Sequence, residues 1–524
     1  MLINRPRSAI LNFIIGLAIA LGIHACSNST ITNVPNNNTQ SIQIGISSEN
    51  LIFEDKIVSL IKKATGRPVE VQTKGSVRLT ELACSGQLSA MMIADEMWPN
   101  IKCPDASWIN TSDAVYSTRI QFALPVAKAR ELGWLNRVIS REEVVAALKA
   151  GKIRLATTTP THSNSGYNTL LWLVRGEISP NLTPEQITPE SLASLQPIYK
   201  NLAISSESTS YLAQKLAQEW PDDTLAALYR FLYTADGKAV YYQGDKLQLP
   251  QKVALIDVSP AIAVTPTWFV TTSNEQLKQQ LMEQVFGKLD TASQNLLKEL
   301  KQLNPPLPEG ITQEFTPVAE IHRNLLNSFH PNIRQKRWIV GIVDASGSMQ
   351  GTGYRELQEA FQELLNVERA KNNYLYSPND RFSLIIYQGK NAYQIPPGST
   401  AGAEIDRVAI LRSLQKDVQP RGGTPVAKGL KIGFQTALTI APEYKTEIFL
   451  FTDGQFSDPV DADLLNIFQQ LEDKNAEFTI VGAGEVDRKA LINLAELLNA
   501  RPIISEDANE TLEELLKAFR EAQI

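Results

Sequence analysis

One stretch decides the fold of the C-terminal part of the chain: Trp338-Ile339-Val340-Gly341-Ile342-Val343-Asp344-Ala345-Ser346-Gly347-Ser348-Met349. It begins with an apolar run rich in β-branched residues, which is typical of a buried strand. The run leads directly into an Asp-x-Ser-x-Ser loop that offers one carboxylate and two hydroxyls. Open α/β folds bind ligands at the carboxyl edge of the sheet, and Mg²⁺ prefers oxygen donors. The stretch therefore predicts an α/β domain with an oxygen-rich site at a strand end.

Strands and helices alternate regularly from residue 337 onward. This alternation predicts a mostly parallel sheet covered by helices on both faces. The expected strands are 338–343, 382–387, 447–451 and 478–481. The expected helices begin near 354, 407, 426, 462, 486 and 510.

Two further loops of this domain carry oxygen donors. Gly422-Gly423-Thr424-Pro425 places a hydroxyl just before a helix, and Thr452-Asp453-Gly454 ends an apolar strand on a carboxylate. An Asp-x-Ser-x-Ser loop alone is a weak signal, because turns and helix caps use the same side chains. The three loops together are more specific, since each starts at the end of an element and all occur in order within one α/β unit.

With these loops, residues 337–524 resemble a von Willebrand factor A (VWA) domain with a complete metal-ion-dependent adhesion site. The resemblance implies a Rossmann-like, doubly wound α/β fold. It makes Ser346 and Ser348 direct ligands of Mg²⁺, or of Mn²⁺ or Ca²⁺, and Thr424 a direct or water-mediated ligand. Asp344 and Asp453 are then expected to hold coordinated waters. The open coordination position is expected to take a carboxylate from a protein partner. A degenerate site that binds nothing is the alternative, although no liganding position is missing.

The length and charge of the chain limit the number of domains and the classes of partner. A chain of 524 residues suggests about three domains. The net charge is only −6 and no long basic run occurs, which argues against a nucleic-acid partner. Neither an activated nucleophile, nor a paired acid and base, nor a Gly-x-x-x-x-Gly-Lys phosphate loop is found, so the chain is not predicted to be an enzyme.

The N-terminus reads as an export signal, with Arg5 and Arg7 followed by an apolar run at 10–23. The apolar run is short for a membrane span. It ends in Ile23-His24-Ala25-Cys26, which resembles the lipobox of bacterial lipoproteins. The resemblance implies a signal peptide at 1–25 and a lipidated Cys26 that anchors the chain to the membrane at the periplasmic side of the cell envelope. His24 is unusual at its position, so an uncleaved anchor and ordinary secretion stay open.

Residues 26–40 are mostly Asn, Ser and Thr and are predicted to form a flexible tether. Beyond Cys26 the chain has only two cysteines, Cys84 and Cys103. In an exported chain an even pair predicts a disulfide. Two buried free thiols are the alternative, because sequence cannot settle the geometry.

Residues 41–305 are predicted to form a domain of two α/β lobes. Expected strands lie at 41–46, 69–71, 90–93, 118–125, 153–157 and 261–271; expected helices lie at 77–83 and 165–174, then onward through 233, with closing helices at 274–303. The chain leaves one lobe, builds the second and returns to the first. This layout resembles a bacterial periplasmic solute-binding protein of type 2. Proline and glycine then mark residues 306–336 as a linker that holds a short helix at 318–326.

The loop 157–166 of the second lobe follows a strand and opens a helix. Hydroxyls and free amides at a helix start can hold an anion without a counter-charge. Solute-binding relatives that take oxyanions resemble this, so the candidate solute ligands are Thr161, Ser163, Ser165 and Gly166, together with Ser47 and Ser48 from the first strand end. Plain helix capping is the alternative.

The sequence therefore predicts an exported, lipid-anchored binding protein. Its VWA domain grips a protein carboxylate through Mg²⁺, and its two-lobed domain binds a small solute such as an oxyanion. The main alternative is a receptor that delivers a small anion to a membrane transporter, with the VWA domain serving only for docking. In a third interpretation the two-lobed domain has lost its ligand and acts as a scaffold.

Overall fold

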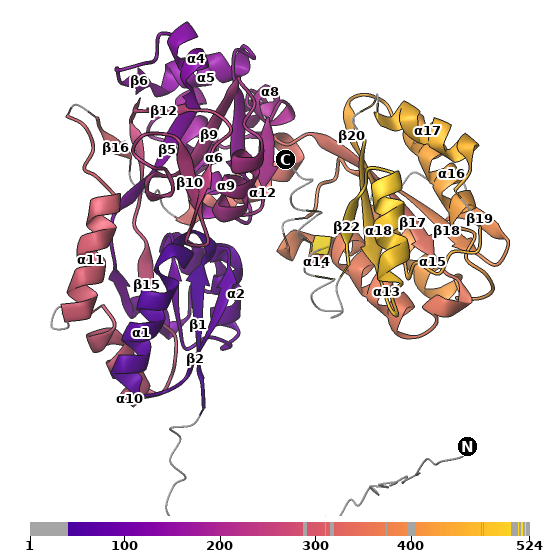
Figure 1. Cartoon of the computed structure of the whole chain (residues 1–524), viewed down its shortest axis with the longest axis horizontal. Helices are drawn as coiled ribbons and strands as arrows, with labels where there is room; N and C mark the ends of the chain where they lie inside the picture. The colour runs from indigo at the N-terminus through magenta and orange to yellow at the C-terminus, as the bar shows by residue number, and fades with distance from the viewer. Residues whose placement is uncertain are drawn as a thin grey trace, which may run out of the picture. The chain divides into compact units, whose positions relative to one another are not determined.

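The computed structural model describes residues 40–286, 291–309, 311–314, 319–373, 375–395, 404–458, 460–472, 474, 476–504, 512, 515–516 and 519 (Figure 1). The predicted signal peptide at 1–25, the lipidation site Cys26 and all of the tether but its last residue lie outside the described residues. Of the helices within them, none has the length and apolarity that crossing a membrane requires.

A five-stranded sheet with the order β2-β1-β3-β15-β4 forms the first lobe. β1 runs parallel to β2 and β3, whereas β15 pairs antiparallel with β3 and β4. The strands are β1 (Ile42–Ser47), β2 (Val69–Lys74), β3 (Ala90–Ile93), β4 (Ser112–Ala114) and β15 (Thr267–Val270). The helices are α1 (Glu54–Thr65), α2 (Ser76–Cys84), α3 (Met97–Lys102), α10 (Glu275–Gln284) and α11 (Thr291–Leu303).

A seven-stranded sheet with the order β16-β14-β5-β9-β7-β8, with β12 beside β5, forms the second lobe. The chain enters it between β4 and β5 and leaves it between β14 and β15, so the predicted two-lobed α/β layout is confirmed. The strands are β5 (Thr118–Pro125), β7 (Arg154–Thr158), β8 (Ile204–Ser206), β9 (Thr224–Tyr229), β12 (Val253–Ile256), β14 (Ala261–Val264) and β16 (Gln313–Glu314). The main helices are α4 (Val126–Glu131), α5 (Arg141–Lys149), α6 (Asn164–Glu177) and α9 (Thr209–Gln218).

The expectation of helices alone between residue 174 and Tyr233 is wrong, because β8 and β9 lie in this region. All six residues of β9 are buried. A strand buried on both faces shows no alternation of polar and apolar residues. Its Leu-Ala-Ala-Leu core also favours a helix locally, so packing in the sheet overrides the local preference.

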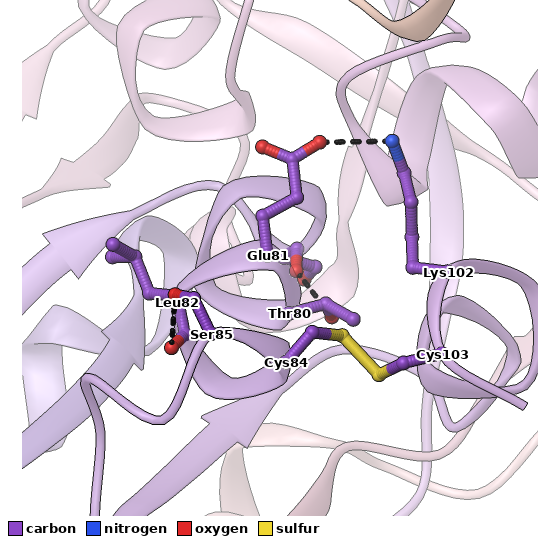
Figure 2. The surroundings of a disulfide bond; sticks show 8 residues. Thr80, Glu81, Leu82, Cys84, Ser85, Lys102 and Cys103 are labelled. Atoms are coloured by element: carbon purple, nitrogen blue, oxygen red, sulfur yellow. Dashed lines mark hydrogen bonds and ion pairs between the residues drawn. A yellow bond between two sulfur atoms is a disulfide. The ribbon is translucent and has the colours of Figure 1, made fainter. Parts of the chain in front are cut away.

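A disulfide joins α2 to the residue after α3 (Figure 2). The bonded residues are Cys84 and Cys103, whose Cα atoms lie 6.1 Å apart. Beside it, Lys102 Nζ lies 2.8 Å from Glu81 Oε1 and links the same two helices. The covalent bond and the ion pair together fasten α3 to α2 at the edge of the first lobe.

The C-terminal domain is built on a six-stranded sheet with the order β19-β18-β17-β20-β21-β22. All neighbours run parallel except the edge strand β19, an antiparallel strand that sequence analysis did not predict. The strands are β17 (Lys336–Asp344), β18 (Arg381–Gln388), β19 (Asn391–Ile395), β20 (Tyr444–Thr452), β21 (Glu477–Gly482) and β22 (Arg501–Ile503). The helices are α13 (Thr352–Leu365), α14 (Val367–Asn372), α15 (Glu404–Lys416), α16 (Val426–Leu438), α17 (Ala462–Glu472) and α18 (Arg488–Leu497).

Helices cover both faces of this sheet (Figure 1). On β17, Ile339 and Val343 pack in one hydrophobic cluster with α13, and Val340 and Ile342 pack in another with α16. Successive side chains of a strand point to opposite faces, so a strand covered on both sides must be apolar throughout. The predicted doubly wound α/β fold is confirmed.

The segment predicted as a linker, 306–336, is partly structured. β16 pairs with β14, and α12 (Ala319–Asn332) is longer than the helix expected at 318–326. Its buried Leu325 and Phe329 pack in the core of the two-lobed domain. These side chains lie one helical turn apart, so α12 is held by its apolar face.

Candidate functional site

Asp344 ends the central strand β17 and is fully buried. The Ser346 backbone N–H donates to Asp344 Oδ1 over 2.8 Å, and the Thr452 hydroxyl donates to Oδ2 over 2.7 Å. The Tyr387 hydroxyl reaches the same Oδ2 at 3.3 Å. Donors from the loop and from both neighbouring strands therefore fix this carboxylate in one orientation.

The other predicted metal ligands gather beside Asp344. Ser346 Oγ lies 3.0 Å from Ser348 Oγ in the same loop. The Gly347 N–H donates to the Gly422 carbonyl over 2.9 Å, which fastens this loop to the one that carries the buried Thr424. The hydroxyls thus come from two loops that are hydrogen-bonded to one another.

Asp453 follows β20, next to β17 in the sheet, and is buried. Its Oδ1 accepts a hydrogen bond from the Gln455 N–H over 3.0 Å. Its Oδ2 is buried and has no hydrogen-bond partner within the described ranges. A buried carboxylate oxygen without a partner is costly, so it needs a proton or a cation.

The electrostatics of the site favour a cation. Burial, together with a smaller effect of the Asp453 charge, raises the pKa of Asp344 to about 6 against the effect of its hydrogen bonds. The described residues hold no cluster of three or more His, Cys, Asp or Glu side chains suited to a metal. A metal at this sheet edge therefore depends on the serine and threonine hydroxyls together with two carboxylates. Such a set of oxygen donors fits a hard divalent cation.

One of the predicted solute ligands, Ser48, lines a hollow between the two lobes that residues of the C-terminal domain also border. Ser48, from the end of β1, and His162, from the loop before α6, line the same hollow. The Ser210 hydroxyl of the second lobe donates to the Ser48 carbonyl over 2.7 Å. Ser47 accepts a hydrogen bond from the Asn50 side chain over 2.9 Å. The two loops that the sequence singled out therefore meet at one cleft.

The hydroxyls before α6 are bonded to one another. Thr158 Oγ1 lies 2.8 Å from Ser163 Oγ and 2.9 Å from Ser165 Oγ, and Ser165 Oγ lies 2.6 Å from Thr209 Oγ1. Thr161 Oγ1 pairs with His162 Nδ1 over 2.8 Å. An incoming solute must therefore replace these bonds rather than meet free hydroxyls.

Gly166 has a packing role in α6. A Cβ atom at this position would lie 2.1 Å from the Thr158 carbonyl oxygen, so only glycine lets the helix approach β7 this closely. This packing requirement explains the glycine at position 166 without any role in binding a solute.

Three polar residues of the cleft were not singled out from the sequence. Trp98 Nε1 donates to Asn164 Oδ1 over 3.1 Å and joins the lobes a second time. Glu49 is buried beside Ser48, and its Oε1 has no hydrogen-bond partner in the part of the chain that the structure describes. The position of Glu49 directly after a strand was the available signal. In a Ser-Ser-Glu-Asn turn, however, a charged residue normally indicates exposure.

A comparison with family models matches residues 339–518 to the von Willebrand factor type A domain. No curated protein matches the chain. Among solved structures, the chain is similar to a von Willebrand factor type A protein from Catenulispora acidiphila, with 20% identity and a TM-score of 0.30. That match covers 37% of this chain and 44% of the other, so the chain spans less than half of that protein's length.

The N-terminal part is similar to solute-binding proteins. One is the sulfate-binding protein SubI from Mycobacterium tuberculosis H37Rv, with 11% identity, coverage of 54% of this chain and 95% of the other, and a TM-score of 0.37. Another is the periplasmic binding protein AfuA from Actinobacillus pleuropneumoniae, with 12% identity, coverage of 55% and 94%, and a TM-score of 0.35. The family match confirms the resemblance stated for the C-terminal domain.

Proposed function

We propose that this chain, whose residues 339–518 match the von Willebrand factor type A domain, binds a carboxylate of a protein partner through a divalent metal ion. The metal is Mg²⁺, with Mn²⁺ or Ca²⁺ as substitutes. The observation that supports this most is the buried, unpartnered Oδ2 of Asp453, beside the buried Asp344 and the paired hydroxyls of Ser346 and Ser348.

Each residue has a distinct part in this proposal. Ser346 and Ser348 bind the ion directly, and Thr424 binds it directly or through water. Asp344 and Asp453 accept hydrogen bonds from waters on the ion and orient them. When bound, the ion supplies an electrophilic centre for an acidic group, because few carboxylates touch it.

We further propose that the two-lobed domain is a solute-binding clamp and that neither module is catalytic. The bonds from Ser210 to Ser48 and from Trp98 to Asn164 span the lobes, as a closed clamp requires. The oxyanion ligand set of Ser47, Ser48, Thr161, Ser163, Ser165 and Gly166 stays a prediction. The transport-receptor alternative predicts that an anion such as sulfate or phosphate binds this clamp.

Export and lipid anchoring at Cys26 complete the proposal and rest on the sequence alone. An exported chain meets partners in the cell envelope, where divalent metals are available. Mass spectrometry of the mature chain tests the anchor, since lipidation adds acyl chains to a chain that begins at Cys26. A chain that retains residues 1–25 would contradict it.

A pull-down from cell envelope extract tests the metal-dependent function. The tagged chain is incubated with Mg²⁺ or with EDTA, and Ser348→Ala is compared with Ser413→Ala, a change on α15 outside the candidate site. We expect a partner that is retained with Mg²⁺, lost with EDTA, lost with Ser348→Ala and kept with Ser413→Ala. Equal retention with EDTA or with Ser348→Ala would contradict the proposal.

A further inference from the structure

Glu49 is a buried acidic residue next to Ser48, which lines the hollow between the lobes. It is 5% exposed, and its Oε1 has no hydrogen-bond partner among the residues that the structure describes. Its Oε2 has a long contact of 3.4 Å with the hydroxyl of its neighbour Ser48. Hydrogen bonds from its own backbone N–H and from the Ser47 and Ser48 hydroxyls only partly offset the rise in the pKa of Glu49 that burial causes. A carboxylate buried in this way is destabilising unless a proton or a cation compensates it.

A second carboxyl group lies in the same region. Asp95 follows β3, next to β1 in the sheet, and is 5% exposed. Neither Glu49 nor Asp95 forms an ion pair with a described lysine, arginine or histidine, and burial raises the pKa of both. Both carboxyls also raise the pKa of the buried Tyr229 hydroxyl, after the larger effect of its burial. Two buried carboxyl groups without a described basic partner therefore lie near Tyr229.

Aromatic rings pack on the short helix that carries this carboxylate. Phe53 lies in the same short helix as Glu49, and its ring centroid is 6.4 Å from that of Tyr116 and 6.2 Å from that of Phe231. Phe231 in turn lies 6.0 Å from Tyr116 and stacks on Tyr229 at 5.7 Å. The Tyr116 hydroxyl donates to Asn50 Oδ1 over 2.6 Å, which holds that ring beside the turn that carries Glu49.

A carboxylate beside aromatic faces is a combination that recognises organic cations. An ammonium group gains hydrogen bonds to the carboxylate, and its charge is attracted to ring faces within about 6 Å. A sulfate or phosphate ion placed here would instead meet a carboxylate of its own sign. The hydroxyls before α6 do not offset this repulsion, because they are already bonded to one another.

We propose that the cleft between the two lobes binds a small solute that carries an ammonium group, which donates to Glu49 and lies against the rings of Tyr116 and Phe231. The inference rests on the proposed role of this domain as a solute-binding clamp and names the chemical class of its solute. The solute enters when the bonds from Ser210 to Ser48 and from Trp98 to Asn164 are open, and it is enclosed when they form.

Titration calorimetry on the full chain tests this inference. The ammonium probes are putrescine, spermidine, choline and lysine, and the anionic probes are phosphate and sulfate. Glu49→Gln keeps the size of the side chain and removes its charge. Glu275→Gln, at an 83% exposed side chain on α10, is the matched control.

We expect at least one ammonium probe to bind, Glu49→Gln to weaken that binding about 10- to 100-fold, and Glu275→Gln to leave it unchanged. Without a probe, Glu49→Gln should melt no lower than the unmodified chain, because it removes an unpaired buried charge. A lower melting temperature would show a structural role for Glu49 and overturn the inference.

The titration results also distinguish a failure of the ammonium assignment from a failure of the proposed solute-binding clamp. Binding of sulfate or phosphate without binding of any ammonium probe would overturn the ammonium assignment and leave the clamp intact. Ammonium binding that Glu49→Gln does not weaken would also overturn it, since the solute would then lie elsewhere. No binding by any probe of either charge would count against both.

Discussion

Asp453→Asn is the sharpest test of the metal centre, because it removes one charge and almost no volume. Asp453 is buried with one carboxylate oxygen unpartnered in the described structure, so its charge is destabilising without a cation. Its charge also raises the pKa of Asp344, which means that the two carboxylates oppose one another. Without a metal ion, the variant should therefore be as stable as the unmodified chain or more stable.

Asp453→Asn should lose most of the stability that Mg²⁺ adds to the unmodified chain. Mg²⁺ at one hundred times its Kd stabilises a folded domain by about 2.7 kcal/mol. Removing a group that orients the ligands of a metal weakens binding about 10- to 100-fold. A 100-fold loss leaves only about 0.4 kcal/mol at the same Mg²⁺ concentration. For a domain of this size the Mg²⁺-induced shift in Tm should fall from about 5–10 °C to about 1–2 °C.

Differential scanning calorimetry of the full chain in EDTA and in Mg²⁺ measures both quantities. Asp463→Asn is the matched control, because its side chain is 75% exposed on α17. We expect the control to keep the full Mg²⁺ shift. A full shift in Asp453→Asn, or an equal loss in both variants, would refute the assignment of Asp453 to a metal centre.

Three further predictions concern stability. Replacing Cys84 and Cys103 by serine removes a link across a sequence separation of 19 and should cost about 3 kcal/mol in urea unfolding, while a reducing agent should bring the unmodified chain to the same value. Asp380→Asn should cost about 3–5 kcal/mol at pH 7 because it leaves the buried Arg334 without its carboxylate and leaves the buried Arg337 with Glu447 alone. Burial alone would raise the pKa of Asp380, but the arginine charges lower it well below its usual value, so its contribution is present above about pH 4 and the difference between variant and parent should shrink as unfolding is measured at lower pH. Burial raises the pKa of Asp95 to about 6, so this group should contribute a loss of about 3 kcal/mol as pH rises from about 4 to above 6, and Asp95→Asn should remove that part of the pH dependence of urea unfolding.

The fold of the C-terminal domain was largely predictable because residues close together in the sequence mark each of its main elements. The central strand is apolar throughout, since both of its faces are buried, and its end is marked by Asp344 and the two serines. The structure places Thr424 and Asp453 at the same sheet edge, as the order of the loops predicted. The edge strand β19 was missed because an antiparallel strand at a sheet border has one solvated side and only a short apolar signal.

The two-lobed domain was less predictable because its main features depend on contacts between distant segments. β9 looks helical in isolation and becomes a strand through its pairing with β5 and β7. Glu49 looks like an exposed turn residue but is buried, and the neighbouring Asn50 is bonded to Tyr116, which comes from later in the chain. No local pattern shows that a charged residue will be enclosed in this way.

The two candidate sites share one physical feature and differ in what surrounds it. Each places a buried carboxylate oxygen without a described partner just after a strand, Asp453 Oδ2 after β20 and Glu49 Oε1 after β1. Such an oxygen favours a cation in both places. At Asp453 the neighbours are hydroxyls on loops tied together by hydrogen bonds, which suit a small, hard metal ion. At Glu49 aromatic rings pack on the short helix that carries the carboxylate, and such rings attract an organic ammonium group but supply few oxygen ligands to a metal. Removing Glu49 should therefore leave the Mg²⁺ response intact, and removing Asp453 should leave ammonium binding intact.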